Sequence, residues 1–274
     1  MALYLENEIQ VLGYPPKRKN KWKWIVAILV VVIVLVVAFV YFLREEEEID
    51  LRTFKTELNA PPPREPEPEM TSGVEYTMEE VNDVSMYMFR LMDMPAELAL
   101  DINEYKDSTE CFIIQAADIR KDNGKFVGDF VLDGEKLASG KRKKGYCAIL
   151  DGEVKIGVSE DDEMMNRCIS QGGSFFRQYP LVVDGVMQKN LVKGKSIRRA
   201  LAKKGEELYI VETELRESML NFAEALQDFG MTNAISLVGG NKAYMHWLQE
   251  GELYENYELE EVANQNFLVF KRKE

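Results

Sequence analysis

The longest apolar run of the chain lies near its N-terminus, where residues 24–43 read WIVAILVVVIVLVVAFVYFL without a charged side chain. A helix of this length measures about 30 Å, the thickness of the hydrocarbon core of a bilayer. A secretory signal peptide has a shorter apolar core and a small-residue cleavage site, and no such site follows this run. The pattern therefore predicts a retained transmembrane helix over 24–43, in contact with membrane lipid.

Charge is distributed unequally around this run. Residues 1–23 contain five basic and two acidic side chains, whereas Arg44 and four consecutive glutamates follow the run. Positively charged flanks stay in the cytoplasm, which predicts a cytoplasmic tail over 1–23 and an extracytoplasmic location for all that follows. We expect a single-pass membrane protein whose C-terminal domain faces the periplasmic side of a bacterial inner membrane.

The next segment is rich in proline and acid. Five of the nine prolines and nine acidic residues fall between Glu45 and Gly73. Such a composition buries too little apolar surface to offset the chain entropy lost on folding. We expect a linker over 44–73, followed by one domain over 74–274.

Apolar spacing then divides the domain into elements. Over 78–103 the apolar residues recur at helical intervals, which predicts a helix with a break near Pro95. Strand-like runs follow, and two of them, Tyr146–Leu150 and Val154–Val158, flank Asp151-Gly152. An Asp-Gly pair between two apolar runs is a strong hairpin signal.

The last third of the chain reads as a strand–helix–strand unit. Glu207–Glu212 is a predicted strand, Arg216–Phe229 a helix and Asn233–Val238 a second strand, followed by Gly239-Gly240. Such a unit predicts parallel strands with a right-handed crossover. Ligands bind beyond the carboxyl ends of strands in open α/β sheets, where Glu212 and the diglycine fall. The predicted fold class is α+β, a mixed sheet with flanking helices.

Composition narrows the possible chemistry. A net charge of −13 argues against a nucleic-acid partner. With one histidine and three cysteines, a histidine-rich zinc site and a disulfide-stapled scaffold are both disfavoured. The glycine-rich nucleotide motifs are absent. We therefore predict no cofactor, and we name no metal-binding residues. Whether the protein requires a metal stays open. The basic run 141–144 is read as a solvated loop, with contact to an anionic ligand as the alternative.

Three segments follow one another in a familiar order. They are FFRQYPLVVDG (175–185), IRRALA (197–202) and FAEALQDFGMTNAISLVGG (222–240). In this order and spacing the chain resembles, from about Cys111 to Trp247, the phosphodiester glycosidase family, relatives of the lysosomal "uncovering enzyme". It is most similar to membrane-anchored members from Bacteroides-type bacteria.

The resemblance implies hydrolysis of a phosphodiester at the anomeric carbon of a sugar. Arg198 stands at the arginine of the family motif, and arginine binds phosphate through two donors at once. The acidic residue that precedes the diglycine in the family is Val238 here. Because valine can act neither as acid nor as base, Glu212 and Asp118 are the predicted substitute carboxylates, so that Arg198, Glu212 and Asp118 form the candidate catalytic set.

The predicted substrate-binding residues come from the same segments. They are Gln115, Arg177, Gly239, Gly240 and Asn241. Structural alternatives stay open, namely a carboxylate partner for Arg198 and a surface ion pair for Arg177. Three functions follow: an enzyme acting on a sugar phosphodiester, a catalytically degenerate glycan-binding or scaffold protein, and an envelope assembly partner. The oligomeric state stays undetermined.

Overall fold

The computed structural model describes residues 72–105, 108, 110–140, 143–190, 192–249, 252–256 and 264–273, together with Val32. These residues, Val32 excepted, belong to one compact unit, Glu69–Glu274. The predicted tail (1–23), the predicted span (24–43) and the linker (44–73) lie outside the described residues, except for Val32 and the last two linker residues.

The predictions of a membrane anchor and of a single-pass location need correction. In the part of the chain that the structure describes, no helix combines the length and the apolar character that crossing a bilayer requires. The expected contact with membrane lipid and the expected periplasmic placement of the domain are therefore without structural support.

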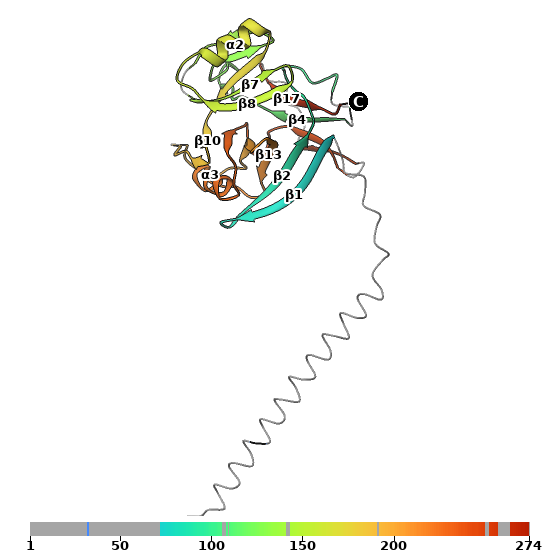
Figure 1. Ribbon diagram of the computed structural model, residues 1–274, viewed down its shortest axis with the longest axis vertical. Helices are drawn as coiled ribbons and strands as arrows, with labels where there is room; N and C mark the ends of the chain where they lie inside the picture. The colour runs from blue at the N-terminus through green and yellow to red at the C-terminus, as the bar shows by residue number, and fades with distance from the viewer. Residues whose placement is uncertain are drawn as a thin grey trace, which may run out of the picture. The chain divides into compact units, whose positions relative to one another are not determined.

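The predicted α+β class is also wrong, because the domain consists mainly of β-strands. The described residues form seventeen strands in three sheets and two helices of nine and ten residues. The helices lie far apart, with α2 (Glu163–Gln171) beside β7 (Gly145–Leu150) and α3 (Met219–Asp228) beside β10 (Pro180–Val183) (Figure 1).

The largest single error concerns the helix expected over 78–103. This segment forms the antiparallel hairpin of β1 (Gly73–Val81) and β2 (Val84–Met92), visible as a long ribbon in Figure 1. Asn82 and Asp83 make its two-residue turn, with φ of 53° and 60°. Asparagine and aspartate tolerate this left-handed conformation better than other non-glycine residues, and two such residues suit the twist of a hairpin.

The first sheet has seven antiparallel strands. Its order is β1, β2, β13 (Glu207–Thr213), β12 (Arg199–Lys204), β14 (Asn233–Ser236), β10 and β11 (Val186–Met187). The strands β13 and β14 both run antiparallel to β12. They are therefore parallel to each other, as the strand–helix–strand pattern predicts, but β12 lies between them.

Helix α3 packs through the apolar face that its sequence predicts, but it begins at Met219 rather than at Arg216. The Ser218 hydroxyl accepts a hydrogen bond from the Asn221 backbone N–H (3.0 Å), a typical N-terminal cap. Its apolar side chains pack on one face of the seven-stranded sheet, against residues such as Met86, Ala200 and Val211. Gly230, with φ of 96°, follows the end of the helix.

Two five-stranded sheets complete the domain. One has the order β16 (Glu252–Asn256), β15 (Met245–Gln249), β4 (Cys111–Gln115), β17 (Phe267–Lys271) and β3 (Ala96–Ala99). The other has the order β6 (Glu135–Ala138), β5 (Phe130–Leu132), β9 (Ser174–Gln178), β7 and β8 (Glu153–Val158). The predicted hairpin at Asp151-Gly152 is confirmed as the β7–β8 turn.

All three sheets contribute to one apolar core. Phe89 from the first sheet, Phe112 and Phe270 from the second, and Phe176 from the third are buried in the same cluster. The Phe89 and Phe112 rings lie 5.3 Å apart, centre to centre. Cys111, Cys147 and Cys168 are free and buried, where a cysteine packs as a small apolar side chain.

Candidate functional site

Three of the predicted site residues meet in one small cavity. A pocket of about 180 Å³ beside the start of β12 includes Asp118, Tyr179, Arg198, Arg199, Ser236 and Gly239 in its lining. We call this the Arg198 pocket. It brings together the predicted catalytic pair Arg198 and Asp118 and the predicted binding residue Gly239, although residues 118 and 239 are far apart in the sequence.

Gly239 shapes this pocket through a close backbone contact. A Cβ atom at position 239 would lie only 2.5 Å from the Ile197 carbonyl oxygen, so no larger residue fits without a shift. Gly240 has φ of 101°, and its N–H donates to the same carbonyl (2.9 Å). The diglycine therefore contacts the segment that carries Arg198; the close approach explains glycine at 239, and the positive φ explains glycine at 240.

Arg198 lies one residue ahead of β12 and is half-buried. Its Nε donates to the Glu217 carbonyl (2.8 Å) and its Nη2 to the Gly194 carbonyl (2.6 Å). Burial lowers the pKa of Arg198, and the nearby Glu217 carboxylate opposes this shift. Two carbonyl partners orient the guanidinium without cancelling its charge, because a carbonyl is neutral.

The neighbouring Arg199 has the opposite character. It is opposed to Glu212 in the β12–β13 register, and the two form an ion pair with only 2% and 7% of each residue exposed. Arg199 Nη1 also donates to the carbonyls of Ala243 (2.8 Å) and Tyr244 (3.1 Å). Glu212 is thus held in a buried structural pair, and it is not among the residues that line the pocket.

Strand alternation would separate adjacent arginines onto opposite faces, yet both line the Arg198 pocket. The alternation rule holds within a strand, and Arg198 lies one residue ahead of β12.

Asp118 is paired with a residue that the sequence reading missed. Its carboxylate, 40% exposed, bonds the ammonium of Lys143, whose side chain is 1% exposed. Lys143 also donates to Gln178 Oε1 (2.7 Å) and lies over the Tyr179 ring, 4.9 Å from its centre. Burial lowers the pKa of Lys143, and Asp118 acts in the opposite direction.

The prediction of a solvated loop over 141–144 is therefore wrong at Lys143. Residues 141 and 142 lie outside the described part of the chain, and Lys144 is exposed and paired with Glu160. The available signal is position, because Lys143 lies two residues before the largely buried strand β7. Its partner is 25 residues away in sequence, so no local pattern identifies it.

Gln178 links this pair to the sheet. Its Nε2 donates to the Ala116 carbonyl (3.3 Å), and its Oε1 also accepts from the Ser236 hydroxyl (3.4 Å) at the end of β14. Two lining residues of the pocket, Asp118 and Ser236, are consequently connected behind its wall by hydrogen bonds through Lys143 and Gln178.

The other predicted binding residues have structural contacts. Arg177 is buried, where it pairs with Asp129 (2.6 Å) and donates to the carbonyls of Ser159 (2.7 Å) and Asp161 (2.9 Å). Gln115 Oε1 accepts from the Tyr244 N–H (3.1 Å). Neither lines the Arg198 pocket, and the exposed Asn241 follows the diglycine at the surface.

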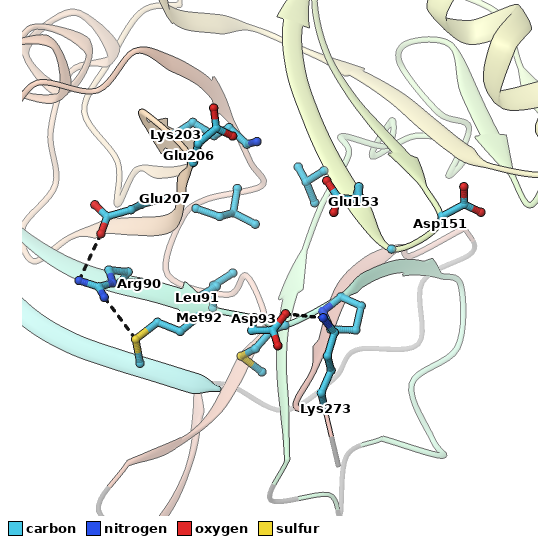
Figure 2. Close-up of a pocket in the computed structure, with 15 residues that line it drawn as sticks. Arg90, Leu91, Met92, Asp93, Asp151, Glu153, Lys203, Glu206, Glu207 and Lys273 are labelled. Atoms are coloured by element: carbon cyan, nitrogen blue, oxygen red, sulfur yellow. Dashed lines mark hydrogen bonds and ion pairs between the residues drawn. The ribbon is translucent and has the colours of Figure 1, made fainter. Parts of the chain in front are cut away.

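A larger cavity of about 400 Å³ lies elsewhere, between the end of β2, the β7–β8 turn and the start of β13. Figure 2 shows that two of its three basic residues have acidic partners: Arg90 bonds Glu207, and Lys273 bonds Asp93, while Lys203 also lines the cavity. Asp151, Glu153 and Glu206 add further negative charge. This cavity is poorly suited to an anion and contains none of the predicted site residues.

A metal centre finds no support in the described residues, where no group of three or more His, Cys, Asp or Glu side chains is placed to hold an ion.

Comparison with known proteins identifies solved structures that share this fold. No family model and no curated protein matches the chain. Among solved structures, the zebrafish N-acetylglucosamine-1-phosphodiester α-N-acetylglucosaminidase catalytic domain, auto-inhibited by its pro-peptide, is similar with a TM-score of 0.51 and 13% identity, over 77% of this chain and 86% of that one. A hypothetical protein from Synechocystis is similar with a TM-score of 0.51 and 12% identity, over 73% of this chain and 62% of that one. At these identities the chain shares a fold with both proteins.

Proposed function

We propose that the Arg198 pocket binds a sugar phosphodiester through its phosphate, without efficient turnover. The distant structural similarity to a phosphodiester glycosidase domain supports this class of ligand. The observation that carries the proposal is the charge of the pocket. Of the two arginines in its lining, Arg199 is neutralised by Glu212, whereas the hydrogen-bond partners of the Arg198 guanidinium among the described residues are two carbonyl oxygens.

The charge balance favours a singly charged ligand. Arg199–Glu212 and Lys143–Asp118 each sum to zero, and Glu217 near Arg198 is itself paired with Lys195 (2.8 Å). One positive charge is left over at Arg198. A phosphodiester carries one negative charge at neutral pH, whereas a phosphomonoester carries nearly two, so the diester is the better match.

The carboxylates argue for binding rather than hydrolysis. Glycoside hydrolysis normally needs one carboxyl group as acid and a second as base or nucleophile. Asp118 is the one carboxylate among the described residues that line the pocket, and it is paired with Lys143. Glu212 is committed to Arg199, and Val238 offers no proton. In this proposal Asp118 accepts a hydrogen bond from a sugar hydroxyl.

Calorimetric titration of the full-length protein tests the proposal. The ligands are N-acetylglucosamine-1-(methyl phosphate), N-acetylglucosamine-1-phosphate and the neutral methyl glycoside, with released sugar measured in parallel. We expect binding of the diester, weaker binding of the other two, and no sugar release above the buffer blank.

The variant Arg198→Ala should lose diester binding. Arg167→Ala is the matched control, because Arg167 is an exposed arginine on α2 whose Nε bonds Gln171 (3.2 Å). Equal diester affinity in both variants would overturn the proposal, and rapid sugar release would replace it with the hydrolase function.

A further inference from the structure

The ammonium of Lys143 is buried, which is unusual for a lysine. A buried cation is retained only when an opposite charge and hydrogen-bond acceptors surround it. Here the charge comes from Asp118, the acceptor from Gln178, and the face of the Tyr179 ring adds a cation–π contact. Two segments distant in sequence, at Asp118 and at Gln178-Tyr179, therefore hold one side chain behind the pocket wall.

Lys143 does not itself line the pocket, whereas Asp118 does. A ligand in the pocket would thus meet the carboxylate directly and the ammonium only through it. Without Lys143, the negative charge of Asp118 would face the ligand uncompensated and would cancel the charge of Arg198. One unit of charge in the lining of a small pocket changes the binding of a charged ligand considerably.

We propose that Lys143 is a specificity-determining residue that neutralises Asp118 and so leaves the Arg198 pocket with the single positive charge that selects a monoanion. This inference rests on the proposed function, since it concerns the same pocket and the same ligand. Lys143 acts through Asp118 and is a positioning residue, not a catalytic one.

Charge compensation gives a test that a purely structural lysine would not pass. The full-length wild-type protein, Lys143→Met, and the double variant Lys143→Met/Asp118→Asn are titrated with N-acetylglucosamine-1-(methyl phosphate). We expect the single variant to bind about tenfold more weakly or worse, and the double variant to bind within about threefold of the wild type, because it again has one net positive charge.

The adjacent lysine provides the matched control. Lys144 is exposed and paired with Glu160 at the surface, so Lys144→Met should bind the diester as the wild type does. Thermal unfolding of every variant without ligand is recorded in parallel. If Lys143→Met does not fold but the double variant folds and binds, the result supports the inference, because the two proteins differ only at position 118.

The outcomes separate the two proposals. A wild-type protein that does not bind the diester overturns the proposed function. A wild-type protein that binds, together with a Lys143→Met variant of equal affinity, overturns the charge role of Lys143 alone. The same conclusion follows if the double variant stays as weak as the single one or fails to fold.

Discussion

Arg199 and Glu212 face each other across β12 and β13, and the ion pair between them is almost wholly buried. The same register places the arginine against the carbonyls of Ala243 and Tyr244, so its guanidinium joins the first sheet to the segment that precedes β15. Glu212, a predicted catalytic residue, thus serves as the buried partner of the arginine that makes this connection.

This pair predicts a large loss of stability on removal of one partner. Glu212→Ala leaves the Arg199 charge buried and unpaired, which we expect to lower the free energy of unfolding by about 3–5 kcal/mol. Urea denaturation measures the change. Glu214→Ala is the matched control, since Glu214 is an exposed glutamate two residues away. A loss below about 1 kcal/mol for Glu212→Ala would contradict the structural role.

A second prediction concerns the lack of space for a side chain at Gly239. In Gly239→Ala the added Cβ would press against the Ile197 carbonyl, which is backbone and cannot rotate away. We expect a loss of stability together with weaker diester binding, because the segment carrying Arg198 must move. The comparison variant is Gly205→Ala, where φ is 61° but nothing lies within 4 Å, so only strain of about 1 kcal/mol is added. Equal stability of the two variants would contradict the proposed clash.

Acid stability should depend on Glu217. The hydrogen bond from Lys195 is the main cause that lowers the pKa of Glu217 below 4.5, and burial opposes it. Because the folded pKa lies below the unfolded one, the contribution is present above about pH 4.5 and is lost as the pH falls through the folded pKa. Glu217→Gln should therefore show a shallower decline in unfolding free energy below pH 4.5 than the wild type.

The control for this prediction lies on the helix that follows Glu217. Glu224 is an exposed residue of α3, so Glu224→Gln should leave the acid limb of the stability profile unchanged. Parallel acid limbs for the wild type and Glu217→Gln, measured by urea denaturation at each pH, would contradict the assignment.

The β1–β2 turn gives a fourth prediction. Asp83 has φ of 60°, a conformation that glycine adopts freely and a β-branched residue strongly resists. Asp83→Gly should be at least as stable as the wild type, whereas Asp83→Val should lose about 1–2 kcal/mol. Thermal unfolding of the wild type and the two variants measures these differences. A valine variant as stable as the glycine variant would contradict the left-handed conformation at Asp83.

Local signals explain which elements the sequence reveals. The Asp151-Gly152 pair identifies the β7–β8 hairpin, and the apolar face ahead of Gly230 identifies α3. The β1–β2 hairpin was missed because β2 buries side chains on both faces, which removes the alternation of a half-buried strand. Its turn also lacks the glycine that usually accompanies asparagine or aspartate.

The sequence predicts the candidate site only in part, because the interactions that determine its chemistry are long-range. Arg198, Asp118 and Gly239 were identified from motif positions, and the structure places them around one pocket. The partnerships that decide their chemistry are long-range, such as Lys143 with Asp118 and Arg177 with Asp129, 48 residues apart. Burial of a charge depends on such partners, and no local pattern of residues encodes them.

The shared core has a consequence for thermal unfolding of the domain and for its truncation. Phe89, Phe112 and Phe176 reach it from three separate sheets, so each sheet supplies a wall that the other two cannot replace. Deleting the strands of one sheet would open the interior to water and leave the others without a hydrophobic partner. We expect heat to disrupt the domain in a single cooperative step, and fragments ending between sheets to be recovered as aggregates.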